Sequence, residues 1–210
     1  SLKQINTLAI PAIIAGISEP ILSLTDAAIV GHMPIHATES LAAVGVVTAF
    51  LSMLIWVLGQ SRSAISSIIS QHVGANKLEE VKNLPAQAIA IVLGISFVVC
   101  CLTYPFSNAI FKLYNASGLL LDYSVSYYKI RVLGLPFTLY IFAIFGVFRG
   151  LQNTYYPMLI AITGALVNIV LDFALVYGIK DVFLPLNLKG AAFASVLSQL
   201  LMALLATYFI

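Results

Sequence analysis

The stretch LAIPAIIAGISEPILSLTDAAIVG, residues 8–31, decides the fold, because it is almost wholly apolar yet carries two prolines and two acids. A helix of this length reaches about 36 Å, enough to cross a hydrocarbon core of about 30 Å with some tilt. We therefore predict a bent membrane-spanning helix. Pro11 is its expected hinge, because a proline frees the carbonyl four residues earlier and weakens the helix locally.

Glu19 and Asp26 are the two acids of this stretch, and both are predicted to lie inside the membrane. An acid at the centre of a spanning helix costs roughly 2.5–3.5 kcal/mol on insertion scales, so such a residue suggests a functional site. The two acids are nearly two helical turns apart and fall on one stripe of the helix. We predict that they face a common cavity, with lipid on the other side.

The composition of the chain predicts an all-α polytopic membrane protein. It is 61% hydrophobic and 9% charged, with a mean hydropathy of +1.03, whereas soluble domains are about 25% charged. The net charge of +2 is scattered and forms no basic cluster, which excludes nucleic acid as a partner. HExxH, GxSxG and other paired catalytic motifs are missing from the sequence, so we expect no enzyme. The first apolar run has full length, and we expect it to be a retained span.

Apolar windows separated by polar segments predict a bundle of six membrane-spanning helices. An even number of spans places both termini on one side of the membrane. The expected helices cover about residues 8–31, 41–70, 84–111, 119–149, 155–178 and 189–210.

Three further polar patterns interrupt these apolar windows. Serines recur at helical spacing after Arg62, which indicates either close helix packing or one wall of an aqueous vestibule. Asn168 and Asp172 are i,i+4 neighbours on one face of the fifth helix, and they form a second intramembrane polar group. An aromatic and basic belt at one membrane face, explained by snorkelling anchors, is predicted from Tyr123, Tyr127, Tyr128, Lys129 and Arg131.

Several motifs together resemble the multidrug and toxic compound extrusion (MATE) family, in particular its DinF-like branch. Each motif alone is weak, but their order and spacing are specific and span the whole chain. The motifs are LTDAAIVGH at residues 24–32, SQHVGANKLEEV at 70–81, RGLQNTYYP at 149–157, NIVLDFALVYG at 168–178 and KGAAFASVLSQ at 189–199.

The resemblance implies a transporter of twelve helices in two lobes. Residues 1–210 would be the N-terminal lobe, and the missing C-terminal lobe of the same protein would be its partner. The family's cation site would match Asp26, Asn168 and Asp172, with Ser195 as a hydroxyl ligand, and H+ or Na+ as coupling ion. No other cofactor is implied. Glu19 departs from the family pattern, and we interpret it as a second proton carrier, a cation-substrate contact, or a hydrogen-bond acceptor towards a neighbouring helix.

The leading functional hypothesis is therefore cation-coupled antiport of drug-like amphipathic or cationic organic compounds across the bilayer of a bacterial inner membrane. One alternative is a flippase for lipid-linked oligosaccharides, which would need several cavity bases to hold pyrophosphate, and only Arg62 is expected to serve. Another is a passive six-helix channel or structural module, in which Asp26, Asn168 and Asp172 form a satisfied polar network. The sequence identifies no substrate-binding residues.

Overall fold

The computed structural model describes residues 2–179, 182 and 184–210, without the side chains of residues 2–4, Glu19 and Leu78. Every regular element in these residues is a helix. The α-helices are α1 (Leu2–Gly31), α2 (Ala37–Leu58), α3 (Ser61–Gly74), α4 (Leu84–Leu113), α5 (Gly118–Arg131), α6 (Leu135–Gly150), α7 (Tyr155–Tyr177) and α8 (Leu188–Phe209). Two short 3-10 helices, η1 (Leu78–Val81) and η2 (Val132–Gly134), lie between them.

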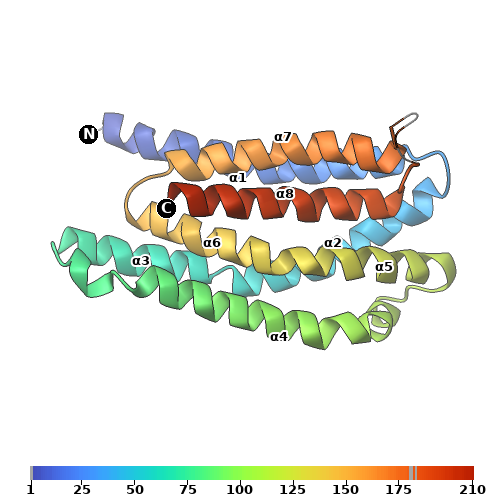
Figure 1. Ribbon diagram of the computed structural model, residues 1–210, viewed down its shortest axis with the longest axis horizontal. Coiled ribbons are helices and arrows are strands. Elements are labelled where there is room, and N and C mark those ends of the chain that lie inside the picture. Colours follow the sequence, from blue (N-terminus) through green and yellow to red (C-terminus); the bar gives the residue numbers. More distant parts are fainter. Residues whose placement is uncertain (1, 180–181, 183) are drawn as a thin grey trace.

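Six segments are long and apolar enough to cross a membrane, which confirms the predicted all-α, six-span fold. They are Ile5–Gly31, Ala37–Gly74, Glu79–Leu113, Gly118–Gly150, Tyr155–Tyr177 and Leu188–Phe209. The helices run along the long axis of the molecule, and the N- and C-termini lie at the same end (Figure 1).

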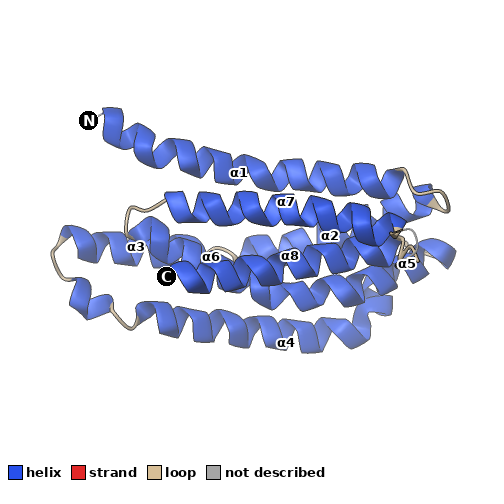
Figure 2. Cartoon of the chain, turned by 45° about the horizontal axis from the view of Figure 1, so that its top comes forward, coloured by secondary structure: helices blue, strands red, loops and turns tan. Residues whose placement is uncertain are grey.

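Helix α8 connects two groups of helices. It packs against α7, which in turn packs on α1, and it also contacts α5, α6, η2 and, over a small area, α1. Helices α2, α3 and α4 complete the bundle on the far side of α5 and α6 (Figures 1 and 2). The long α1 therefore contacts mainly α7, and its outward side carries exposed apolar residues such as Ile13, Ile17 and Leu24. This is the surface expected of a helix with lipid on one side.

The second and fourth spans are interrupted in the middle, where the sequence predicts continuous helices. The second span breaks between α2 and α3 at Gly59, where an added Cβ would collide with the ring of Phe142. The fourth span breaks at η2, just before Pro136. A proline cannot donate to the carbonyl four residues earlier, here that of Val132. The thiol of Cys100 donates to this carbonyl instead, at 3.3 Å.

Helix α3 packs on α6 through apolar residues and not through its serines. The buried Ile65 and Ile69 lie against Gly146 and Gly150 of α6, where any larger residue would collide with them. The serines at positions 63, 67 and 70 are exposed instead.

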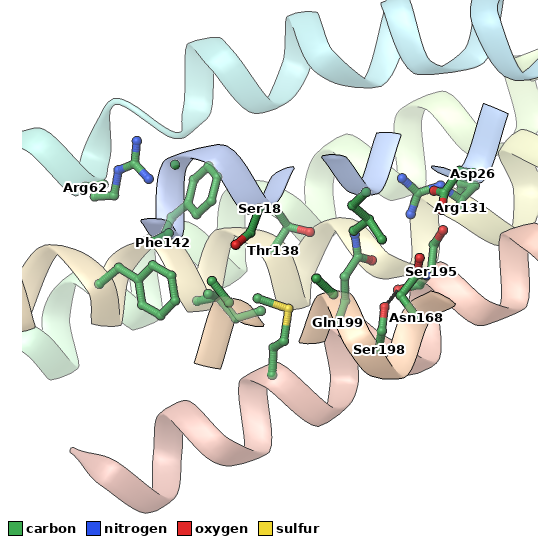
Figure 3. A pocket seen from close by; sticks show the side chains of 18 of the residues that line it. Ser18, Asp26, Arg62, Arg131, Thr138, Phe142, Asn168, Ser195, Ser198 and Gln199 are labelled. Carbon is green, nitrogen blue, oxygen red and sulfur yellow. Dashed lines mark hydrogen bonds between the residues drawn. The ribbon is translucent and has the colours of Figure 1, made fainter. Parts of the chain in front are cut away.

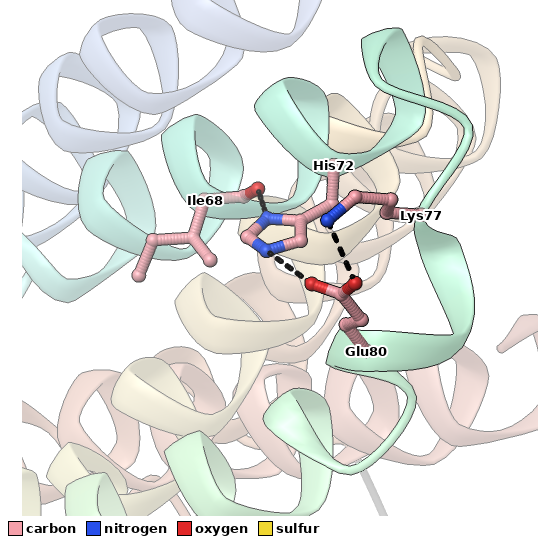
Figure 4. Close-up of polar contacts among 4 residues, drawn as sticks. All are labelled: Ile68, His72, Lys77 and Glu80. Carbon is pink, nitrogen blue, oxygen red and sulfur yellow. Dashed lines mark hydrogen bonds and ion pairs between the residues drawn. The ribbon is translucent and has the colours of Figure 1, made fainter.

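In the segment that connects α3 to α4, a histidine and a lysine contact the same carboxylate (Figure 4). His72 donates from Nδ1 to the carbonyl of Ile68 at 2.8 Å, while its Nε2 lies 3.9 Å from Glu80. Lys77 pairs with the same Glu80 at 3.0 Å. These contacts fold the SQHVGANKLEEV motif into a compact turn between α3 and α4.

Helices α7 and α8 approach closely because small residues line their interface. At Gly190, an added Cβ would lie 2.5 Å from the backbone carbonyl of Leu175. At Gly164 it would collide with the side chain of Met202. Ala191, Ala192 and other small residues of α8 are also buried here. This close crossing brings the polar face of α7 against α8.

Candidate functional site

A polar cluster lies in the apolar bundle where α1, α7 and α8 meet. Asn168 and Asp172 of α7 are fully buried, and their i,i+4 spacing directs both side chains to the same face. Asp26 reaches them from α1, and Ser195 from α8 (Figure 3). The structure thus brings together the four residues that the resemblance assigns to a cation site.

The amide of Asn168 links the other three residues of the cluster. Its orientation is assigned from its neighbours, since one side faces acceptors and the other faces a donor. The nitrogen donates to Asp26 Oδ1 at 3.0 Å and to Asp172 Oδ2 at 3.2 Å, and the oxygen accepts from the backbone N–H of Ser195 at 3.1 Å. One side chain therefore connects three helices.

The carboxyl groups of Asp26 and Asp172 are also hydrogen-bonded to each other. Two carboxylates are acceptors only, so this contact needs a proton on one of them. Among the described residues, no N–H or hydroxyl group donates to the buried Asp172 Oδ1. The pair can therefore carry one proton between its two carboxyl groups.

Ser195 contributes to the cluster differently from the expectation. Its hydroxyl donates to the carbonyl of Ala191 at 3.1 Å, within its own helix. The contact with Asn168 is made by the Ser195 backbone N–H. In this conformation the serine positions the amide through its main chain, while its hydroxyl is occupied elsewhere.

Pro11 and Glu19 lie in α1, away from the cluster along the chain. The helix continues through Pro11, and next to it the hydroxyl of Thr154 donates to the carbonyl of Leu8 at 2.9 Å. At the other end of α1, Tyr177 donates to the carbonyl of Ile29, also at 2.9 Å. The side chain of Glu19 lies outside the described part of the structure, so its predicted role stays a prediction.

The predicted interfacial belt is wrong for Arg131, Tyr127 and Tyr128. Tyr127 and Tyr128 are buried in the bundle, and Arg131 points into its interior beside Asp26 (Figure 3). Arg131 is hydrogen-bonded to Tyr127, and its charge acts on both Asp26 and Asp172. The i,i+4 spacing of Tyr127 and Arg131 shortly before Pro136 is the signal that could have indicated a buried pair at a helix break.

The polar cluster opens into a cavity of about 250 Å³ between α1, α6, α7 and α8. Its walls are largely apolar, with Phe142 and Phe145 from α6 (Figure 3). Three arginines line it: Arg62, Arg131 and Arg149. The expectation that only Arg62 could serve as a cavity base is therefore wrong, because the break at η2 turns Arg131 inwards and the cavity face of α6 carries Arg149.

A membrane bundle with a carboxyl pair between its helices, next to an internal cavity, defines the class: one lobe of a membrane transporter. Residues 11–174 match the MatE family model, so the chain belongs to the MatE family of transporters, as its sequence motifs predict. Like its bacterial relatives, it is a multi-pass protein of the inner membrane.

The chain is similar to several curated proteins and solved structures. The chain is 30% identical to DNA damage-inducible protein F of Escherichia coli over 94% of this chain and 41% of that protein. It is 26% identical to the probable multidrug resistance protein NorM of Thermotoga maritima, over 99% of this chain and 44% of that protein. The solved structure of a MOP superfamily transporter from Pyrococcus furiosus superposes with a TM-score of 0.88 at 25% identity, covering 99% of this chain and 44% of that one. The chain thus spans less than half the length of these relatives.

Proposed function

We propose that this chain is the N-terminal lobe of a cation-coupled antiporter that extrudes amphipathic organic compounds and catalyses no chemical reaction. The observation that carries this proposal is the hydrogen-bonded pair of the half-buried Asp26 and the buried Asp172 next to a cavity. Ionisable residues inside a membrane bundle are costly and are typical of ion and proton pathways. A C-terminal lobe would supply the other half of the substrate path.

The coupling ion in this proposal is H+ or Na+, bound at Asp26, Asn168 and Asp172. The orientation of Asn168, with its N–H groups towards both carboxylates, suits a shared proton. Na+ prefers oxygen ligands, so it would need the amide to turn its oxygen towards the acids and release the Ser195 N–H. Either ion would reduce the repulsion between the two acids.

Ion binding would act on the position of α1. Asp26 is the α1 residue in the hydrogen-bond network, and its opposing groups lie on α7 and α8. A bound ion draws these helices together, whereas two free carboxylates push them apart. Because an ion can shift a conformational equilibrium only by its differential affinity for the two states, this change in packing is the proposed coupling step.

Pro11 is the proposed hinge of this movement, and Pro11→Ala should lower efflux several-fold while ion binding persists. Alanine restores a backbone donor and straightens the helix, about four turns from Asp26. Spin labels at residues 6 and 155 would report the separation of α1 and α7, and efflux would be measured in proteoliposomes. Pro157→Ala is the matched control, because Pro157 lies in the first turn of α7 and costs no helical hydrogen bond. Unchanged efflux with unchanged label distances in Pro11→Ala would exclude the hinge.

The coupling itself is tested with the full-length protein in proteoliposomes under imposed pH and Na+ gradients. Efflux that accelerates with one gradient supports the proposal and identifies the ion. Efflux that is indifferent to both gradients would favour the passive channel. Arg131 and Arg149 line the cavity together with Arg62, and these three bases support the flippase alternative. Movement of lipid-linked oligosaccharide without a gradient would favour a flippase over an antiporter.

A further inference from the structure

The arginines of this chain are distributed in an unusual way. The sequence contains three arginines and seven lysines. All three arginines, from α3, α5 and α6, line the cavity beside the polar cluster, whereas no described lysine does. Basic anchors at the membrane surface would use both residue types, so this separation indicates a role specific to the guanidinium group.

Arginine differs from lysine in the way it binds anions. Its guanidinium is planar, always charged and weakly hydrated, and it donates two parallel hydrogen bonds to a carboxylate, sulfonate or phosphate. It also stacks on aromatic rings. A wall that combines arginines with phenylalanines therefore matches an acidic group attached to an apolar body.

The charge of Arg131 is balanced within the polar cluster. Arg131 lies beside Asp26 and acts on both acids of the cluster. Asp26 is the one acid among the described residues that line the cavity. Asp26 and Asp172 together carry one negative charge when they share a proton. Even with Glu19 counted as a second full negative charge, three arginines then face two negative charges, and the cavity keeps a positive balance.

Arg62 and Arg149 flank the aromatic wall of the cavity. The guanidinium of Arg62 lies 4.7 Å from the centre of the Phe142 ring. The main chain of Arg62 packs against Gly146, which lies midway between Phe142 and Arg149 on α6. Phe142, Phe145 and Arg149 all line the cavity at i, i+3 and i+7 of that helix. The guanidinium of Arg62 from α3 therefore lies over one end of a stripe of α6 about 10 Å long, and Arg149 lies at the other end of that stripe.

We propose that this cavity binds an anionic amphipathic compound, with its carboxylate, sulfonate or phosphate group held by Arg62 and Arg149 and its apolar body on Phe142 and Phe145. This inference names the substrate class for the proposed antiporter and rests on that function for transport. It replaces the expectation of cationic substrates. Binding itself requires no ion gradient, so it can be tested separately from coupling.

The test is equilibrium binding to the full-length protein in uncharged detergent. Three fluorescent probes share one apolar body and differ in the headgroup: pyrenebutyrate, pyrenebutanol and pyrenebutyl-trimethylammonium. We expect pyrenebutyrate to bind tightest. Arg149→Gln should weaken its binding at least tenfold and leave pyrenebutanol unchanged, and Arg62→Gln should act in the same direction. Arg149→Lys keeps the charge but loses the paired hydrogen bonds, so an intermediate loss is expected.

Lys112→Gln is the matched control, since it removes an exposed cation outside the cavity and should change none of the three affinities. Tighter binding of the ammonium probe than of the carboxylate would overturn the proposal. Equal weakening of all three probes by Arg149→Gln, with unchanged thermal stability, would overturn it too, because the arginine would then only shape the cavity.

A second arm distinguishes a dissolved anion from a lipid headgroup. Phosphatidylglycerol is added to the micelles in the presence of bound pyrenebutyrate. Displacement at a few mole per cent identifies an anionic lipid as the occupant, and no displacement identifies a dissolved organic anion. If the anion binds as expected but gradients do not accelerate efflux, the proposed coupling fails while this binding site stands.

Discussion

Asp172→Asn and Asp26→Asn are each expected to reduce gradient-driven efflux to the level of protein-free liposomes. Asparagine is similar in size and keeps hydrogen bonds to Asn168, so the bundle should fold. It cannot bind a proton in the working pH range and removes one charge that would hold Na+. With only one carboxyl group left, the hydrogen bond between two carboxyl groups that joins α1 to α7 cannot form. The loss should therefore be nearly complete in either variant.

The measurement is efflux from proteoliposomes under a pH or Na+ gradient, with thermal stability recorded for each variant. Asp122→Asn provides the matched control, because Asp122 is an exposed acid of α5 outside the cavity, and its variant should transport at the wild-type rate. Gradient-driven efflux that persists in a folded Asp26→Asn or Asp172→Asn protein would show that the ion does not bind at this pair.

Gly190→Ala is expected to destabilise the lobe by about 3 kcal/mol, at the upper end of the range for overpacking. The added methyl group would lie 2.5 Å from the backbone carbon and oxygen of Leu175 and 2.8 Å from the nitrogen of Val176. Backbone atoms in a helix cannot rotate away as a side chain can, so α8 must move from α7. Ser195, five residues further along α8, would then lose its contact with Asn168. We expect a lowered melting temperature and a large loss of efflux.

Gly94→Ala is the matched control for this substitution. Gly94 lies inside α4, and no atom lies within 4 Å of its added Cβ. Alanine there should stabilise the helix by about 0.5–1 kcal/mol. Equal stability of the two variants would mean that α7 and α8 do not need their close crossing at Gly190.

Much of the fold could be predicted from the sequence because its signals are local. Twenty or so consecutive apolar residues are enough to identify a span, whatever the neighbouring helices do. The i,i+4 spacing of Asn168 and Asp172 fixes a shared face of α7 for the same reason. Their meeting with Asp26 came from the motif resemblance, since spacing on one helix does not reveal which helix packs against it.

The position of the Arg131 side chain could not be predicted from such local signals. Read as part of a continuous helix beside Tyr128 and Lys129, Arg131 matches a membrane-surface anchor. The structure breaks the span at η2 instead, and the carbonyl freed by Pro136 is satisfied by Cys100 from α4. That contact joins residues far apart in the sequence. The side of the break that Arg131 faces depends on how the two halves of the span pack against neighbouring helices, and no periodicity within the fourth span contains this information.

Hydropathy and helical spacing act within one segment, so the sequence was enough to predict six membrane-spanning helices, their all-α class and the positions of Asp26 and Asp172 within them. The tertiary structure decided that Ser195 holds Asn168 through its main chain and that Arg62, Arg131 and Arg149 meet at one cavity. These features depend on close crossings such as that at Gly190 and on helix breaks whose geometry is set by neighbouring helices. The direction of a side chain within a bundle is a property of the packed helices together, and the energy that selects it comes from contacts between segments distant in sequence.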